Sequence, residues 1–326
     1  MDMKQKCKRA LQGKGVLLVF LAIFAALSIF VPSFLTVRNL LTMGRQLTVV
    51  GIAAVGLTFV MISGNSVDLS IGSIISLSGV VCCYIMTHMT NEPVSLALGI
   101  AAALVIGIVI GLINGVMVAG VGVNPFIMTV ITQMFFEGIA LAITKGNSIG
   151  LLPKSFLQIA KAQVLGIPVL IFVMLLFILV GQYIFKRNSI GRIIYAVGSN
   201  KKGAELVGIS ATKVQILCYM FSGFCGGIAG VILSSRSSSA SPAMGGNILL
   251  DIISAVIIGG ASIFGGKGTV FGTAMGVLII GLIDKIINLL GISHNLSMVL
   301  KGLVVLFAVI MDVVRENSSK KRMLEN

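Results

Sequence analysis

Residues 94–119 read VSLALGIAAALVIGIVIGLINGVMVA, a run without a single charged side chain. An α-helix rises about 1.5 Å per residue, so about 20 apolar residues cross the ~30 Å hydrocarbon core of a bilayer. The run is therefore long enough to form a transmembrane helix. Glycine recurs along one face of that helix at Gly107, Gly111 and Gly115, which predicts close packing against a neighbouring helix.

The whole chain has the composition of a membrane protein. Hydrophobic residues make up 57% of its 326 residues and charged residues 10%, and its mean hydropathy is +1.09. Soluble domains carry about 25% charged residues. A soluble globule of this composition would have too few polar residues to cover its surface. This excludes a soluble enzyme, a disulfide-stapled secreted domain and a disordered tail as readings of the whole chain.

Further apolar stretches of similar length follow along the chain. Ten are expected to span the membrane, near residues 15–32, 46–63, 69–88, 94–119, 124–144, 167–185, 213–233, 248–264, 269–290 and 296–313. An even number places both ends of the chain on one side. Most of the 24 Lys and Arg residues then fall on the cytoplasmic side, as the positive-inside rule requires. We expect an all-α polytopic membrane protein, a bundle of about ten transmembrane helices with both termini cytoplasmic.

The sequence predicts a single transmembrane domain over residues 1–326. Outside the spans we expect cytoplasmic tails at 1–14 and 314–326, a cytoplasmic loop at 186–212 and an extracytoplasmic loop at 234–247. The last of these reads SSRSSSASPAMGGN and is rich in Ser, Gly and Pro. Two interpretations stay open for it, a flexible connector and a rim that contacts a partner or a solute.

Four acidic residues fall at or near membrane depth. They are Asp68, Glu137, Asp251 and Asp284. A charge there costs about 2.5–3.5 kcal/mol on insertion scales, so each needs a partner or a watery cavity. Asp68 precedes a span and is expected to cap it. Glu137 is expected to be neutral or to meet Lys145, and Asp284 to reach the membrane surface together with its neighbour Lys285.

The chain shows no pattern typical of catalysis or metal binding. No paired carboxylates or His ligands occur at helical spacing, and the five cysteines lack CxxC spacing, so we interpret them as small packing residues. The segment GGASIFGGKGT departs from the phosphate-loop pattern at Ala261 and Gly268. We therefore expect no catalytic residue, no metal, no cofactor and no bound nucleic acid.

The expected cytoplasmic loop contains a second short-range signal. Within KRNSIGRIIYAVGSNKKGAELVGIS, residues 186–210, Ser199 or Asn200 is placed to cap a short helix that extends to Val207. Gly208 is placed to end that helix in a left-handed turn.

The same loop is basic, yet it presents apolar side chains at Leu206, Val207 and Ile209. An apolar knob with a basic flank suits insertion into a groove on another protein. A helix that lies on anionic lipid is the alternative.

Three segments, in this order, resemble one known family. They are SGNSVDLSIGS (63–73), GRIIYAVGSNKKGAELVGIS (191–210) and LLDIISAVIIGGASIFGGKGTVFGT (249–273). The chain resembles the permease subunit of bacterial ABC importers for monosaccharides, of the ribose type, over nearly its whole length. The family commonly reads SGGIDLSVGS or SGIDLSVGS at the first motif, whereas here Asn65, Ser66 and Val67 precede Asp68.

The resemblance implies a subunit of the bacterial cytoplasmic (inner) membrane that does not itself hydrolyse ATP. Its partners would be a cytoplasmic ATP-binding cassette protein, an extracytoplasmic sugar-binding protein, a second permease subunit that forms a homodimer, and membrane lipid. The resemblance assigns ATPase docking to the 191–210 loop. The residues expected to take part are Arg192, Ser199, Asn200, Lys201, Lys202, Glu205, Leu206, Val207 and Ile209.

A second set of residues matches the family motifs or suits a polar path. Asp68, Ser70, Asp251, Gly265, Gly266, Lys267 and Gly268 are expected to brace broken helix ends along the pathway. Ser, Thr, Asn and Gly suit a neutral, hydroxyl-rich solute. The residues expected along the path are Asn114, Asn124, Thr129, Thr132 and Gln133.

Two other classes of function remain as alternatives. A stand-alone secondary transporter or channel for a small neutral solute would leave the apolar knob of the loop unexplained, and intramembrane charges are sparse for a proton relay. An intramembrane enzyme would need a nucleophile with a base, or metal ligands, at helical spacing, and the sequence has neither.

Overall fold

The computed structural model describes residues 15–310 except 33, 65–66, 292–295, 300, 304–305 and 307–308. The expected tails at 1–14 and 314–326 therefore lie outside the described residues, as do Asn65 and Ser66. The expected tenth span, 296–313, is described only in part, and its described residues are helical.

Nine helices of the described part follow the expected spans. They are α2 (Gly15–Phe30), α3 (Val37–Ile62), α4 (Ile71–His88), α5 (Glu92–Gly115) with the π-helix η1 (Val116–Val121), α6 (Pro125–Thr144), α8 (Val169–Arg187), α11 (Ala211–Ser237), α12 (Gly246–Ile258) and α13 (Val270–Leu289). Seven of them, all except α2 and α12, are long and apolar enough to cross a membrane. The chain is thus an all-α polytopic protein, whereas the count of about ten spans stays a prediction.

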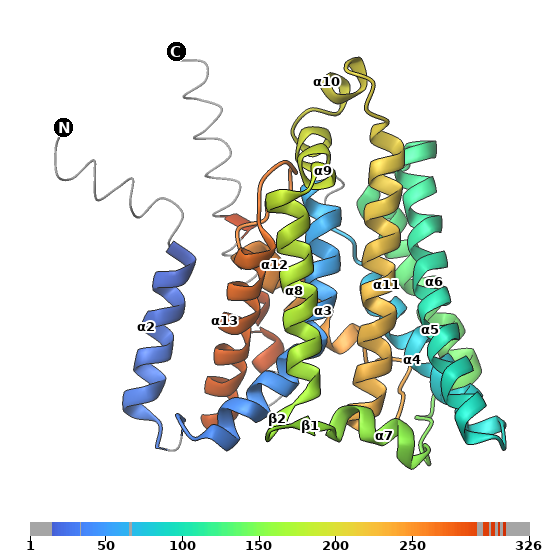
Figure 1. Ribbon diagram of the computed structural model, residues 1–326, viewed down its shortest axis with the longest axis vertical. Coiled ribbons are helices and arrows are strands. Elements are labelled where there is room, and N and C mark those ends of the chain that lie inside the picture. Colours follow the sequence, from blue (N-terminus) through green and yellow to red (C-terminus); the bar gives the residue numbers. More distant parts are fainter. Residues whose placement is uncertain are drawn as a thin grey trace.

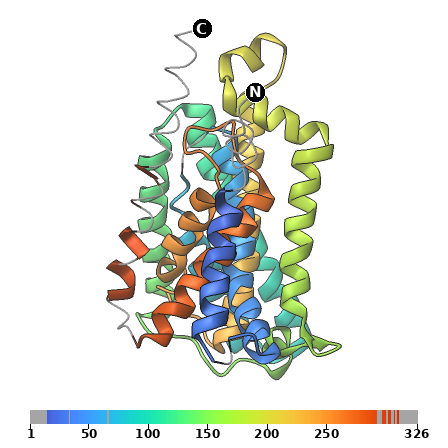
Figure 2. The ribbon, with the colours of Figure 1, turned by 90° about the vertical axis from the view of Figure 1, so that its left-hand side faces the viewer.

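Short elements close the two ends of the bundle (Figure 1). Helix α7 (Lys154–Lys161) and the antiparallel pair β1 (Gln163–Val164) and β2 (Ile167–Pro168) lie at one end. At the other end lie α9 (Ser189–Ser199) and α10 (Lys201–Leu206), in the loop where a helix was expected. Figure 2 shows α10 and the β1–β2 hairpin again at opposite ends.

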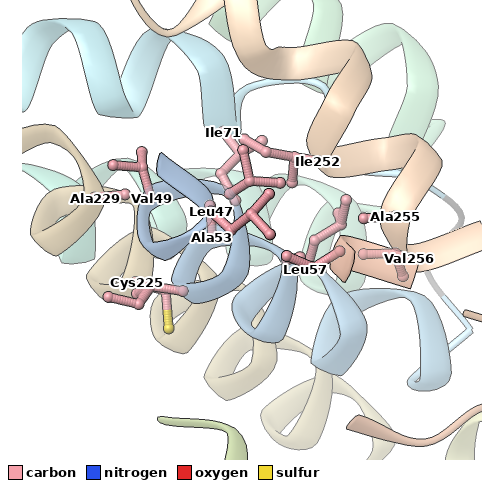
Figure 3. Packing of buried hydrophobic residues seen from close by; sticks show 14 of the residues in the cluster. Leu47, Val49, Ala53, Leu57, Ile71, Cys225, Ala229, Ile252, Ala255 and Val256 are labelled. Carbon is pink, nitrogen blue, oxygen red and sulfur yellow. The ribbon is translucent and has the colours of Figure 1, made fainter. Parts of the chain in front are cut away.

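The core is built around α3, whose residues from Leu47 to Ile62 are all buried. Figure 3 shows side chains of α3 between those of α11 and α12. Small residues permit close contact elsewhere. A Cβ on Gly107 of α5 would overlap the carbonyl oxygen of Gly223 on α11. The glycine face read from the sequence is therefore a helix–helix contact, as predicted.

Helix α12 is shorter than the expected span at 248–264. It ends at Ile258 and a loop follows over 259–269, so the predicted end of that span was wrong. Its 13 residues extend about 20 Å, less than the ~30 Å of a bilayer core. This helix covers only about two-thirds of the bilayer core, so the crossing needs a non-helical connection at membrane depth.

That connection is residues 238–245, which leave α11 and lead into α12. The expected loop at 234–247 was too long, because Ser234 and Ser235 are buried in the last turns of α11. Gly245 packs so closely on Gly72 that a Cβ would overlap the Gly72 carbonyl oxygen, and its N–H donates to Ser76 Oγ at 2.9 Å. The end of this connection is thus held inside the bundle, where its backbone polar groups find protein partners.

A partly buried ion group ties Lys301, near the end of the described residues, to the bundle. Lys301 Nζ lies 2.8 Å from Asp251 Oδ1 and 2.8 Å from Asp284 Oδ1. Asp284 thus pairs with Lys301 and not with its neighbour Lys285, which donates to Asn39 Oδ1 at 2.7 Å. The expectation that Asp284 and Lys285 reach the membrane surface stays a prediction. Hydropathy alone did not reveal the group, since its members lie far apart in the chain.

Replacing Lys301 with Met is expected to lower the free energy of unfolding by about 2–3 kcal/mol, because it leaves two carboxylates together without a cation. The loss stays below that of a fully buried pair since the Asp284 side chain is 35% exposed. Denaturant unfolding in detergent measures it. The triple variant that also carries Asp251→Asn and Asp284→Asn removes the repulsion and should recover most of the loss. Wild-type stability of Lys301→Met alone would contradict the assignment.

Candidate functional site

Helix α4 begins inside the bundle, and Asp68 shapes the turn that leads into it. Its Oδ1 accepts hydrogen bonds from the N–H of Ser70 at 2.9 Å and from Ser70 Oγ at 2.6 Å. Ser70, and not Asp68, occupies the N-cap position, so the predicted cap was wrong by two residues. Asp68 is 1% exposed and Ser70 is fully buried.

A buried polar cluster connects this turn to α5 and α6. Asn114 Nδ2 donates to Ser70 Oγ at 2.7 Å, and Thr132 Oγ1 donates to Asn114 Oδ1 at 2.6 Å. Asn114 and Thr132 were expected along the path, whereas Asp68 and Ser70 belong to a family motif. The fold thus joins residues from both sets into one chain of hydrogen bonds.

Gln133 of α6 supplies the cap that the start of α4 lacks. Its Oε1 accepts a hydrogen bond from the N–H of Ser73 at 2.6 Å, one of the donors left free in the first turn of a helix. Its Nε2 donates to Glu137 Oε2 at 3.1 Å. Glu137 is therefore partnered by Gln133, and the described part of the chain shows no ion pair between it and Lys145.

Two of the expected path residues lie apart from this cluster. Asn124 is exposed and caps α6, where its Oδ1 accepts from the N–H groups of Phe126 and Ile127. Thr129 is buried, and its hydroxyl donates to the carbonyl oxygen of Phe126 at 3.3 Å. Both serve the local structure of α6.

Sequence reasoning missed two polar residues of α11 beside Asp68. Tyr219 and Ser222 lie close to its carboxylate. Their hydroxyl groups and Asp68 Oδ2 are buried without a hydrogen-bond partner in the described part of the protein. No signal in the sequence marks them, because they match none of the three family motifs. Together they can bind water or hydroxyl groups, and no group of His, Cys, Asp and Glu suited to a metal ion occurs among the described residues.

The short helix α10 forms as its sequence predicts. Asn200 Oδ1 accepts from the N–H of Gly203 at 2.9 Å and caps the helix. Gly208 follows its end with φ +82°, the left-handed conformation expected for it. Ala204 is buried against Val197 on one side of this helix.

The other side of α10 projects from the protein. Leu206 is 89% exposed and Val207 is 74% exposed. Ile209 is half-buried and packs on the core of the loop, so only the first two side chains are available to a partner. The polar residues that were expected to contact the ATPase are all exposed. They are Arg192, Ser199, Asn200, Lys201, Lys202 and Glu205.

Backbone segments of all three family motifs meet beneath this surface, at the glycine junction of Gly64, Gly198, Gly265 and Gly266. The N–H of Gly266 donates to the carbonyl oxygen of Ile62, at the end of α3, at 2.9 Å. A Cβ on Gly265 would lie 2.5 Å from Gly64 Cα and 2.8 Å from the Gly198 carbonyl oxygen. Side chains are thus excluded from the junction, and its backbones touch directly.

Two hydrogen bonds reinforce the junction. The hydroxyl of Tyr195 on α9 donates to the carbonyl oxygen of Gly268 at 2.5 Å. Burial raises the pKa of this phenol, so it stays protonated and remains a donor at neutral pH. Gln215 Nε2 donates to the carbonyl oxygen of Ser63 at 3.1 Å. Asp251 of the third motif lies in the Lys301 ion group, and the Lys267 side chain is exposed.

The two regions are continuous along the chain. Gly64 lies at the glycine junction and residues 67–70 lead into α4, so this stretch of the chain connects the α10 end of the bundle to the polar cluster. A displacement of α9 and α10 would press on the end of α3 through backbone contacts. Packed interfaces of this kind transmit displacements because they have few voids to absorb them.

Comparisons with known proteins cover most of the chain. The family described as branched-chain amino acid transport system / permease component matches residues 39–309. The chain is 40% identical to the ribose import permease protein of Haemophilus influenzae, over 90% of this chain and 91% of that one. It is 38% identical to the ribose import permease protein of Bacillus subtilis, over 93% of each chain.

A relative with a different sugar in its name is similar as well. The L-arabinose transport system permease protein of Escherichia coli is 34% identical, over 94% of this chain and 92% of its own length. No solved structure matches the chain.

Proposed function

Because this chain belongs to the branched-chain amino acid transport system / permease component family, we propose that it is the membrane-spanning subunit of an ATP-driven importer for a monosaccharide. The observation that carries the proposal is its similarity, over at least nine-tenths of its length, to permeases named for ribose and for L-arabinose. The substrate class is a neutral pentose or a closely related sugar. The buried hydroxyl and amide groups around Asp68 and Asn114 suit such a solute.

The subunit does no chemistry of its own. ATP hydrolysis belongs to a separate cytoplasmic ATP-binding cassette protein, which docks on α10 through Leu206 and Val207. An extracytoplasmic sugar-binding protein delivers the solute at the opposite end of the bundle, and a second copy of the chain completes the pathway. Both termini lie in the cytoplasm, and the chain crosses the inner membrane ten times, once through the short helix α12 and its non-helical connection.

Transport proceeds by alternating access. Closure of the ATPase moves α10, and α9 carries this displacement through the glycine junction to the end of α3 and the turn at Asp68. The start of α4 then shifts relative to α6, and the path opens toward one side of the membrane or the other. The free energy of ATP binding shifts the equilibrium between an outward-facing and an inward-facing packing of the bundle. The chain therefore needs no series of intramembrane ionisable residues to couple transport to protons.

Reconstitution in liposomes tests this function. Uptake of D-ribose or L-arabinose above background is expected only when the ATPase, the sugar-binding protein and ATP are all supplied. Omission of the ATPase, the sugar-binding protein or ATP should each return uptake to background, because this chain does not itself supply the energy for transport. A stand-alone transporter would instead give uptake driven by a sugar or ion gradient with the purified chain alone, and that result would overturn the proposal.

A further inference from the structure

Helix α6 lies at the edge of the bundle and is the least buried of the seven candidate spans (Figure 1). One face, with Thr129, Thr132 and Ala140, packs inward. The opposite face is uncovered and mostly apolar, with exposed side chains at Ile127, Ile131, Met134, Phe135 and Leu141.

Glu137 stands at the margin between these two faces. It is half-buried and lies seven residues before the end of α6, about 10 Å along the helix axis. Its Oε2 accepts a hydrogen bond from Gln133, while Oε1 has no protein partner among the residues described. Each side of a helix at this depth meets lipid, protein or a water-filled path.

Lipid is an unfavourable environment for the Glu137 carboxylate. Helix α8 is also largely uncovered, and its exposed side chains along the span are apolar, at Phe172, Leu175, Leu176, Leu179 and Val180. That composition is typical of a lipid-facing helix. Ionisable residues within spans face the bundle interior or a watery cavity, because hydrocarbon does not solvate them. Both uncovered faces are mainly apolar, and α6 differs from α8 in the carboxylate of Glu137 at the margin of its face.

The surroundings of Gln133 support a path on this side. Gln133 lies where α4 begins and where the 238–245 connection ends, since a Cβ on Gly72 would meet Gln133 Oε1 at 3.1 Å and the Gly245 carbonyl oxygen at 3.3 Å. Broken helices of this kind line solute sites in transporters. The hydrogen bond from Ser73 fixes the Gln133 amide, which in turn orients the Glu137 carboxylate.

We propose that the sugar passes along the uncovered face of α6 and that Glu137, oriented by Gln133, accepts hydrogen bonds from its hydroxyl groups. The inference rests on the proposed function, and it locates the path between α6 and the second copy of the chain. Carboxylate and amide groups together offer the acceptors and donors that a hydroxyl-rich, neutral solute requires. Asp68 and its cluster then lie behind this face and set its geometry.

The first test measures transport and ATP hydrolysis separately in the reconstituted complex. Glu137→Gln keeps the size and removes the strong acceptor, so D-ribose uptake should fall about tenfold. ATP hydrolysis stimulated by the loaded binding protein should stay near wild type, since the docking surface and the glycine junction are intact. Uptake at the wild-type rate would overturn the role of Glu137, as would a parallel loss of uptake, ATP hydrolysis and thermal stability, which marks a structural role.

The second test measures access to water on the two uncovered helices. In the assembled complex, Met134→Cys on α6 should react with a membrane-impermeant thiol reagent about tenfold faster than Leu176→Cys on α8, because reagents of this kind are excluded from hydrocarbon. The described native cysteines are buried and give little background. D-Ribose should slow the reaction at position 134. Equal rates at both positions would overturn the path.

The proposed function and the path along α6 can be refuted separately. ATP-independent uptake would refute the proposed function, whatever the labelling shows. ATP-dependent uptake combined with wild-type behaviour of Glu137→Gln and an unreactive Met134→Cys would leave the proposed function standing and refute only the path along α6.

Discussion

Replacing Leu206 with Asp is expected to abolish association with the ATP-binding protein and to reduce sugar uptake to background. Leu206 is 89% exposed at the end of α10, next to Val207. Burial of a leucine side chain contributes about 1.5–3 kcal/mol, and an unpaired carboxylate in the same groove costs more. We expect the Kd to rise by about 100-fold or more. Co-purification from detergent and titration with the isolated ATPase measure this change.

The matched control for this variant is Leu165→Asp, at the opposite end of the bundle. Leu165 is 98% exposed in the turn between β1 and β2, so the chemical change is the same and only the place differs. It should leave ATPase association unchanged. Ile209→Asp is a poor choice, because Ile209 packs on the core of the loop and its loss would disturb α10 itself. Wild-type association of Leu206→Asp would refute docking on α10.

Replacing Gly198 with Ala is expected to uncouple the docking surface from the bundle. The added Cβ would overlap the carbonyl oxygen of Ile62 and lie 2.7 Å from the Gly266 nitrogen. Both neighbours are backbone atoms, so α9 must move away from α3. We expect a loss of about 2–3 kcal/mol in the free energy of unfolding, the upper part of the usual range for overpacking. Uptake should fall to background, while the ATPase still binds because Leu206 remains exposed.

The measurement for this variant is ATP hydrolysis stimulated by the sugar-loaded binding protein, alongside uptake and ATPase binding. Uncoupling predicts binding without stimulation. Gly150→Ala is the control, since a Cβ there meets nothing within 4 Å. If Gly198→Ala transports sugar at the wild-type rate, the glycine junction does not carry the coupling displacement.

The helix positions followed from hydropathy with small errors. The span expected at 69–88 is α4, which begins at Ile71, and the span expected at 124–144 is α6, which begins at Pro125. The two largest errors concerned α3, which begins at Val37 and not at residue 46, and α12, where the apolar pattern continues beyond the helix end at Ile258. Hydropathy records how apolar a segment is, and it does not distinguish a helix that crosses the membrane from a short helix followed by a buried loop.

Individual residues of the candidate site were predicted, but the contacts that join them were not. Short-range chemistry indicated the cap at Asn200 and the turn at Gly208, and both are present. Motif and composition selected Asp68 and Asn114 separately, yet nothing in the sequence indicated that Ser70 would connect them. Lys301 falls within the span expected at 296–313, and its two carboxylate partners are identified only in the folded bundle.

Apolar segments and local capping turns can therefore be predicted along this chain, whereas the partnerships among its polar groups cannot. Apolar length, capping residues and glycine turns act between neighbours within one or two helical turns, so the order of residues specifies them. The polar cluster, the glycine junction and the Lys301 ion group join residues from different helices. Their formation depends on which helix faces meet, and that is settled by the packing of the whole bundle in lipid.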